Sequence, residues 1–369
     1  MAYKLLKSLE VVAISVLFVI LQNWANAKPQ VPCYFIFGDS LSDNGNNNNL
    51  NTLAKVNYSP YGIDFPKGPT GRSCRDFVPN FHGESHVWFI ERGASVDAEY
   101  LGFTRSMPPF AESKGQNILN GVNYASGAAG IRDETGKDLG DRIPLDKQIQ
   151  NHKIIILRLS RLMRNNTETR LLLNRCIYSI QIGSNDYINN YFKPEFYDTS
   201  RRFTQMQYAT LLVHQLSNQL KTLYNNGARK FAVYGLSLIG CAPFAISEYG
   251  TNGSFCVDKL NNAAALFNER LMPLIHQLNN GLPYAKFTYL SPSPNSTTFV
   301  TNDTCCTIGG GGGELCLKNS KPCSNRGRFI FWDGFHPTEA WNEKVAQRAY
   351  SSESSLEANP FNIHKLAKL

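Results

Sequence analysis

Ser40 is the first residue of this chain that has the right surroundings for a nucleophile. It lies in the stretch 35–45, which reads Phe-Ile-Phe-Gly-Asp-Ser-Leu-Ser-Asp-Asn-Gly and continues an apolar run that begins at Val31. A short, nearly continuous apolar run that ends at a turn signal is typical of a buried parallel strand. Ligands of open α/β sheets bind just beyond the carboxyl ends of the strands. A serine after a glycine is also common in ordinary turns, so Ser40 needs a base, an orienting acid and oxyanion donors from elsewhere in the chain.

Asp333 and His336 follow another predicted strand, 329–332. Ester hydrolysis by a serine needs a base that takes the hydroxyl proton and an acid that holds the imidazole in one tautomer. We expect His336 to be the base and Asp333 the acid, at the same edge of the sheet as Ser40. A capping aspartate near a surface histidine would give the same spacing. The other histidines lie within predicted helices or in segments without a nearby strand end: His82, His86, His152, His214, His276 and His364.

The oxyanion of a tetrahedral intermediate needs hydrogen-bond donors that are in place before the reaction. Asn185 follows the predicted strand 176–182 within Gly-Ser-Asn-Asp, and its side-chain amide is one candidate. Gly127, in the small-residue segment 120–131, offers a backbone N–H, as does Ser40. Turn formation and close packing are the alternative explanations for Asn185 and Gly127.

Ser237 is a competing nucleophile, because residues 235–239 follow a predicted strand and nearly fit the G-x-S-x-G pattern of a nucleophile elbow. The fifth residue is isoleucine, however, and Gly-Cys-Ala-Pro follows where a helix should begin. Ser40 is therefore the preferred nucleophile. No lysine follows the glycine run 309–313 as a P-loop requires, and residues 39–45 lack the ligand spacing of a calcium loop. No cofactor or metal is expected.

Strands and helices alternate along the chain and would position these residues. Strands are predicted at 31–37, 176–182, 230–234, 286–290 and 329–332, and helices at 154–163, 205–224, 260–278 and from Pro337 onward. Such alternation predicts an α/β fold with a mainly parallel sheet. There is no internal repeat and no convincing linker, so one domain is expected.

Residues 1–27 have the features of a secretory signal peptide. Two lysines precede an uncharged apolar run, 11–21, and Ala-Asn-Ala at 25–27 is a small-x-small cleavage site. The run is too short to span a bilayer, and no later run reaches the roughly 18 residues that a transmembrane helix needs. We expect cleavage after about Ala27, an extracellular protein with no transmembrane segment, and a single domain over 28–369. The formal net charge of +8 is spread along the chain, which is unlike a nucleic-acid binder, and the oligomeric state stays open.

The cysteine content fits this compartment, since cysteines after a signal peptide usually form disulfides. There are nine, so at least one thiol is left over or pairs outside the chain. They lack a CxxC pair, which disfavours zinc. Asn-x-Ser/Thr sequons, plausible glycosylation sites on the surface, occur at Asn57, Asn165, Asn252, Asn295 and Asn302.

Four blocks in this order resemble those of the SGNH hydrolases. They are Gly38-Asp39-Ser40-Leu41, Gly127 in Asn-Tyr-Ala-Ser-Gly, Gly183-Ser184-Asn185-Asp186, and Asp333-x-x-His336. More narrowly, most of the chain after residue 27 is similar to the plant GDSL esterase/lipases. The resemblance implies a flavodoxin-like three-layer α/β/α sandwich, the SGNH hydrolase fold, and cofactor-free hydrolysis of acyl esters. It also implies Ser40 as nucleophile, His336 as base, Asp333 as acid, and Ser40, Gly127 and Asn185 as the oxyanion hole.

The chain departs from that family pattern in two places. Residues 73–97 do not follow it, and the segment 289–304 is shorter than usual and lacks an expected helix. Neither departure touches a catalytic block. The leading hypothesis is a secreted serine esterase or lipase acting on carboxylic, lipid-like acyl esters. The alternatives are an acyltransferase that uses the same triad and a non-catalytic secreted glycoprotein that keeps the fold.

Overall fold

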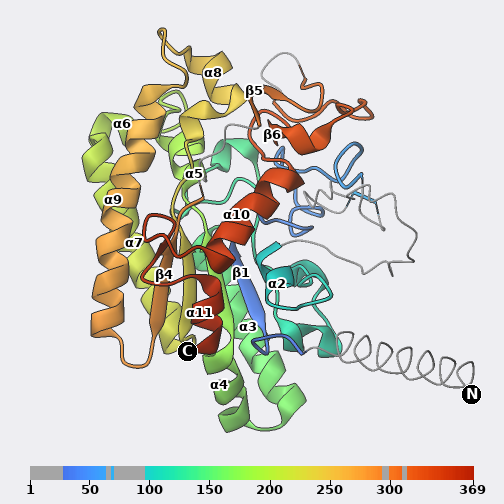
Figure 1. Cartoon of the computed structure of the whole chain (residues 1–369), viewed down its shortest axis with the longest axis vertical. Coiled ribbons are helices and arrows are strands. Elements are labelled where there is room, and N and C mark those ends of the chain that lie inside the picture. The colour runs from blue at the N-terminus through green and yellow to red at the C-terminus, as the bar shows by residue number, and fades with distance from the viewer. Residues whose placement is uncertain (1–27, 64–67, 70–95, 293–298, 310–313) are drawn as a thin grey trace, which may run out of the picture.

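The computed structural model describes residues 28–63, 68–69, 96–292, 299–309 and 314–369 (Figure 1). Its centre is a five-stranded sheet in the order β1-β2-β3-β4-β7. The strands are β1 (Tyr34–Gly38), β2 (Ile177–Gln181), β3 (Lys230–Tyr234), β4 (Lys286–Leu290) and β7 (Ala358–Asn359). The first four are parallel, and β7 pairs antiparallel with β4 at the edge. The expected α/β fold with a mainly parallel sheet is confirmed.

Both faces of this sheet are covered by helices, because successive side chains of each strand point to opposite faces and are apolar on both. Phe35 and Phe37 of β1 pack in the larger core cluster, while Tyr34 and Ile36 pack in a second cluster. Helices α3 (Leu145–Met163), α7 (Gln205–Asn225) and α9 (Asp258–Gly281) contribute to the first cluster. Helices α2 (Val96–Tyr100), α10 (Glu339–Ser351) and α11 (Ile363–Lys368) contribute to the second. The result is the expected three-layer arrangement (Figure 1).

Local signals explain where several helices begin. Thr204 accepts from the backbone of Gln207, whose side chain bonds back to Thr204, so a capping box starts α7. Asn165 caps α4 (Asn166–Arg175), a helix that the sequence analysis missed. Helix α3 begins nine residues before the predicted start at 154; its first turns were missed because buried polar residues such as Gln148 and His152 break the apolar periodicity there. The described residues also contain three shorter α-helices: α5 (Ser184–Asp186), α6 (Thr199–Arg202) and α8 (Pro243–Tyr249).

The strand before Asp333 differs from the prediction. Strand β6 (Phe329–Phe331) lies outside the central sheet and pairs with β5 (Val300–Thr304) in a separate two-stranded sheet. Helix α10 also begins later than expected, with Thr338 as its N-cap and Pro337 before it. The apolar run of β6 shows that it is a strand, but a short run carries no information on its partner.

Four disulfides link eight of the nine cysteines, which confirms the expectation of disulfide bonds. The pairs are Cys33–Cys176, Cys241–Cys256, Cys305–Cys323 and Cys306–Cys316. Cys74 lies outside the described residues, as do the predicted signal peptide and nearly all of the atypical segment 73–97. Among the helices that the structure describes, none is both long and apolar enough to cross a membrane.

Candidate active site

Ser40 lies just past the carboxyl end of β1, as its sequence context predicts. Gly38 closes the strand at a point where a Cβ atom would lie 2.7 Å from the carbonyl oxygen of Gln181 on β2, so only glycine fits. Gln148 of α3 holds the same glycine from the other side. Its Oε1 accepts from Gly38 N–H at 3.0 Å and its Nε2 donates to Gly38 C=O at 2.8 Å. The backbone that carries Ser40 is therefore fixed by β2 and α3 together.

Ser40, His336 and Asp333 form a continuous chain of hydrogen bonds, although 292 residues separate Ser40 from the nearest of the other two in sequence. Ser40 Oγ lies 2.9 Å from His336 Nε2. His336 Nδ1 lies 2.7 Å from Asp333 Oδ1 and 2.9 Å from Oδ2. Asp333 is fully buried, while the His336 side chain keeps 12% of its exposure. This arrangement has the geometry by which an imidazole takes a proton from a serine hydroxyl while a carboxylate fixes its tautomer.

The turn 333–336 orients the Asp333 carboxylate with its own backbone. Phe335 N–H and His336 N–H both donate to Asp333 Oδ1, at 2.9 and 2.8 Å. Gly334 N–H donates to the Glu314 carbonyl at 2.8 Å, and a Cβ atom on Gly334 would lie 2.8 Å from the Glu314 Cβ. A glycine is thus required between the aspartate and the phenylalanine for the loop before Cys316 to pack here.

Asn185 lines the cavity that contains Ser40, at the start of α5. Its Oδ1 accepts from Asn189 Nδ2 at 2.7 Å, and its Nδ2 donates to the Ala129 carbonyl at 3.0 Å. Because an amide nitrogen carries two hydrogens, the second is left for a ligand. These two bonds also fix which end of the amide is the nitrogen.

Gly127, the predicted backbone donor, has a hydrogen-bond partner within the protein. Its N–H donates to Asp43 Oδ2 at 3.0 Å, so this donor is already engaged. The next residue, Ala128, lines the cavity with Ser40 and Asn185. It has a left-handed φ of 64°, which is costly for a residue with a side chain. In the described part of the chain, no acceptor is hydrogen-bonded to the Ala128 N–H. Ala128 is therefore a better candidate donor than Gly127.

The cavity beside Ser40 has a volume of about 1180 Å³. Its walls are largely apolar, with Ile188, Phe192, Leu236, Phe244, Phe331 and Phe335 among the lining residues. Glu314 also lines it, and burial, together with the nearby negative charges of Glu248 and Asp333, raises the pKa of its carboxyl from 4.5 to about 7 against the opposing effect of Lys193. A carboxyl in this state is partly protonated at neutral pH.

Among the described residues, Ser237 and the other histidines do not form a comparable hydrogen-bond chain. Ser237 lines the cavity, but among the described residues no histidine is hydrogen-bonded to it. His214 and His276 are exposed on their helices. His152 is fully buried, where its Nδ1 bonds the Tyr124 hydroxyl at 2.9 Å and burial lowers its pKa from 6.5 to about 3. His82 and His86 lie outside the described residues.

Three of the predicted glycosylation sites are exposed: Asn57, Asn165 and Asn252. Asn295 lies outside the described residues, and the side chain of Asn302 is not described. Asn165 also uses its Oδ1 to cap α4, through Thr167 N–H and Glu168 N–H, and this leaves its nitrogen uninvolved in the cap.

Sequence reasoning missed two residues that hold the site, Gln148 and Tyr61. Tyr61 is buried, and its hydroxyl donates to Asp333 Oδ2 at 2.6 Å. Neither residue lies in one of the four blocks. A polar residue within the apolar face of α3 was the available signal for Gln148. Tyr61 begins the stretch 61–66, which also resembles the family, but nothing in that stretch indicates a bond to Asp333.

The chain matches the family of GDSL-like lipases/acylhydrolases over residues 34–349. It belongs to this family. It is also similar to GDSL esterase/lipase At1g29660 of Arabidopsis thaliana, at 45% identity over 97% of this chain and 97% of the relative. GDSL esterase/lipase At1g29670 of the same plant is 46% identical over 94% of each chain. A third GDSL esterase/lipase, At5g45670, is 43% identical over 94% of this chain and 95% of its own.

This membership confirms three expectations: the GDSL family, its α/β fold, and the class of carboxylic ester hydrolases. The family match spans the end of β1 with Ser40 and the turn with Asp333 and His336. It also spans the atypical segment 73–97, so that segment lies inside the family region of the chain.

Proposed function

We propose that this GDSL hydrolase is a secreted serine esterase that hydrolyses carboxylic esters, with lipid-like acyl esters as its substrates. Ser40 is the nucleophile, His336 the general base and Asp333 the orienting acid. The observation that supports this assignment is the unbroken hydrogen-bond chain from Ser40 Oγ through His336 to the buried Asp333 carboxylate.

The chemistry follows from the positions of these atoms. His336 Nε2 accepts the Ser40 proton as Oγ attacks the ester carbonyl carbon and a tetrahedral oxyanion forms. When the intermediate collapses, the protonated imidazole returns that proton to the leaving alcohol, and the acyl group stays on Ser40. A water molecule then attacks the acyl-enzyme with His336 as base, which releases the carboxylic acid and restores Ser40.

The oxyanion is stabilised by three donors that are in place before the reaction. These are the backbone N–H of Ser40, the backbone N–H of Ala128 in place of that of Gly127, and Asn185 Nδ2. The engagement of Gly127 N–H by Asp43 and the position of Ala128 on the cavity wall support this choice. Donors fixed in this way lower the barrier because they need no rearrangement as charge develops.

The cavity supports a substrate with a substantial apolar portion. Its volume of about 1180 Å³ and its aromatic and aliphatic walls suit an acyl chain better than a small polar acid. Burial of each methylene of such a chain contributes about 0.8 kcal/mol. Glu314 lies in this otherwise mostly apolar space near Asp333, where its half-buried carboxyl adds a polar position on the wall.

Secretion, cleavage after about Ala27, one hydrolase domain over 28–369 and glycosylation belong to the same proposal. Four disulfides support an oxidising compartment, because cytosolic thiols are kept reduced. Exposure of Asn57, Asn165 and Asn252 supports glycosylation at those positions. Amino-terminal sequencing of the secreted protein tests the cleavage site, and peptide mass mapping with and without glycosidase treatment tests glycosylation.

Labelling with a fluorophosphonate probe tests the proposed nucleophile. The wild-type protein should react and lose its hydrolysis of a short p-nitrophenyl ester, and the modified peptide should contain Ser40. Ser40→Ala should abolish labelling and hydrolysis without changing the circular dichroism spectrum. Ser237→Ala is the matched control, since Ser237 lines the same cavity, and it should keep both properties. Full activity of Ser40→Ala would refute the assignment, and an unlabelled, folded wild-type protein would favour a non-catalytic role.

An acceptor experiment separates hydrolysis from acyl transfer. Glycerol or a sugar is added at increasing concentration while free acid and transesterified product are quantified. A hydrolase yields free acid throughout, whereas an acyltransferase diverts most of the acyl-enzyme to the acceptor.

A further inference from the structure

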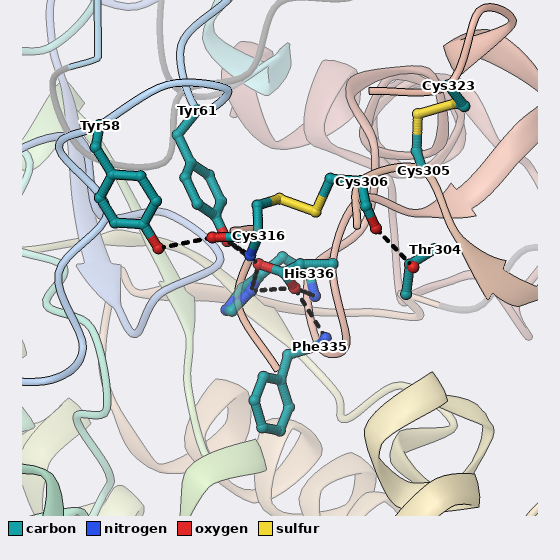
Figure 2. The surroundings of a disulfide bond; sticks show 10 residues. Tyr58, Tyr61, Thr304, Cys305, Cys306, Cys316, Cys323, Phe335 and His336 are labelled. Carbon is teal, nitrogen blue, oxygen red and sulfur yellow. Dashed lines mark hydrogen bonds and ion pairs between the residues drawn. A yellow bond between two sulfur atoms is a disulfide. The ribbon is translucent and has the colours of Figure 1, made fainter. Parts of the chain in front are cut away.

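The hydroxyl of Tyr61 lies between the Asp333 carboxylate and the loop closed by the Cys306–Cys316 disulfide. It donates to Asp333 Oδ2 at 2.6 Å and accepts from Cys316 N–H at 2.9 Å. Figure 2 shows Tyr58 and Tyr61 pointing toward the backbone of Cys316, with His336 beside it. Tyr61 thus binds Asp333, the acid of the proposed triad, from a segment that is remote from it in sequence.

The direction of these two hydrogen bonds is fixed by chemistry. A backbone N–H can only donate, so the bond from Cys316 occupies an acceptor position on the Tyr61 oxygen. An ionised carboxylate can only accept, so the single hydroxyl proton of Tyr61 is directed at Asp333. A distance of 2.6 Å is within the range of a charge-assisted O–H···O⁻ bond.

This donor completes the support of the carboxylate. Asp333 Oδ1 accepts from two backbone N–H groups of its own turn, while Oδ2 accepts from Tyr61. His336 Nδ1 lies within 2.9 Å of both oxygens. The backbone of the turn therefore fixes one oxygen, and Tyr61 fixes the other.

The surroundings of Tyr61 hold it rigidly. The residue is 1% exposed and packs in a cluster with Cys305, Cys306, Cys316 and Trp332. The Tyr58 hydroxyl donates to the Cys316 carbonyl at 3.1 Å, so both polar groups of the Cys316 backbone are bound by tyrosines. The disulfide closes the loop 306–316, from which the N–H of Cys316 reaches Tyr61.

We propose that Tyr61 is a positioning residue for ester hydrolysis, which orients the Asp333 carboxylate and moderates its hold on the His336 imidazole. This inference rests on the proposed function of the triad. With the Tyr61 donor present, part of the carboxylate charge is neutralised and the imidazole can release its proton readily. Without it, Oδ2 loses a fixed partner, and the carboxylate stabilises the protonated imidazole more strongly.

Tyr61→Phe is the test, because it removes only the hydroxyl and keeps the buried ring. We expect kcat to fall about tenfold, because a carboxylate without its Oδ2 partner no longer holds the imidazole in one orientation and the imidazole releases its proton less readily; a tenfold change is about what the net loss of one hydrogen bond produces. KM should stay within about twofold. The acid limb of the profile of kcat/KM against pH should move to higher pH, because the His336 imidazole stays protonated up to a higher pH.

Tyr58→Phe is the matched control. It also removes a tyrosine hydroxyl bonded to the Cys316 backbone, but the hydroxyl proton of Tyr58 is directed at the Cys316 carbonyl and not at the Asp333 carboxylate, so this variant should keep kcat and the pH profile. Glu314 also faces Asp333 and titrates near neutral pH, and Lys193 and Glu248 in turn face Glu314. These groups are the same in both variants, so a shift seen only in Tyr61→Phe belongs to Tyr61.

A double-mutant cycle separates positioning from a general structural role. In an Asp333→Asn background, Tyr61→Phe should change the residual rate by less than about twofold, because its effect passes through the carboxylate. Rates are expressed per serine titrated by the fluorophosphonate, so a partly folded preparation does not mimic a slow enzyme. Where Tyr61→Phe gives no folded protein, 4-aminophenylalanine at position 61 retains a donor and should give a pH limb close to that of the wild type.

These experiments distinguish failure of the proposed function from failure of the proposed role of Tyr61. An unlabelled wild-type protein would overturn the proposed function itself. A labelled wild type in which Tyr61→Phe matches Tyr58→Phe in both kcat and pH profile would overturn the role of Tyr61 alone. An equal loss from Tyr61→Phe with and without Asp333, or an aminophenylalanine variant with a displaced limb, would also overturn it.

Discussion

Replacement of Gln148 should lower both the stability of the protein and the activity of the site. Gln148 is fully buried on α3 and makes three hydrogen bonds to backbone groups. Two of them are to Gly38, and in the third its Nε2 donates to the Ile143 carbonyl at 2.8 Å. Gln148→Leu keeps the size of the side chain and removes all three.

The expected loss of unfolding free energy depends on which hydrogen-bond partners each backbone group keeps after the substitution. Gly38 C=O still accepts from Ser126 N–H at 3.2 Å, so it keeps a partner. Gly38 N–H and the carbonyl of the half-buried Ile143 lose the bonds to Gln148, and a buried polar group left without a partner costs about 1–3 kcal/mol. The leucine recovers part of this through apolar contact. We expect the free energy of unfolding to fall by about 2–4 kcal/mol.

Urea denaturation with intact disulfides, followed by tryptophan fluorescence, measures this change from the shift in midpoint at constant slope. Gln150→Leu on the same helix is the control: Gln150 is exposed, and its replacement should change stability by no more than about 0.5 kcal/mol. Because Ser40 lies two residues after Gly38, Gln148→Leu should also lower kcat per titrated serine. Equal midpoints for the two variants would refute the conclusion that Gln148 holds the end of β1.

Three further predictions concern single side chains. Asn185→Ala should lower kcat by about 100- to 1000-fold with little change in KM, since an oxyanion donor acts in the transition state; unchanged kcat would exclude Asn185 from this role. Burial lowers the pKa of His152 from 6.5 to about 3, so the unfolded chain binds a proton more readily between these values. Its contribution to stability is present above pH 6.5 and is lost by about 1.4 kcal/mol per pH unit as pH falls toward 3; denaturation midpoints of His152→Gln should fall less steeply with acid than those of the wild type. The pKa of Glu314 is raised from 4.5 to about 7, so its contribution is present below pH 4.5 and lost as pH rises through 7. Glu314→Gln should therefore raise the melting temperature more at pH 8 than at pH 5, and the reverse order would contradict a buried, proton-binding Glu314.

The four parallel strands of the central sheet could be predicted from the sequence because each signal is local, whereas the two-residue edge strand β7 was not predicted. Lys230–Tyr234 and Lys286–Leu290 agree with the prediction at both ends, since each is a short apolar run bounded by polar or turn residues. The partner of β6 could not be predicted in this way. Its pairing with β5 is a long-range contact, and nothing within Phe329–Phe331 distinguishes a central strand from one in a small separate sheet.

The start of α3 likewise could not be predicted from local sequence. Its first turns carry Gln148, Asn151 and His152 on the buried face, which breaks the apolar periodicity on which the prediction depended. Those polar groups are tolerated because their partners come from elsewhere in the fold, Gly38 for Gln148 and Tyr124 for His152.

The sequence by itself determined the family, the alternation of strands and helices, and the residue types capable of ester hydrolysis, since these depend on composition and order along the chain. Only the tertiary structure decided which side chains meet: it brings Ser40 to 2.9 Å from His336 and places the Tyr61 hydroxyl on Asp333. It also engages Gly127 with Asp43 and leaves Ala128 on the cavity wall. The physical reason is that hydrogen bonds depend on distance and direction in space, which sequence separation does not specify when loops are long.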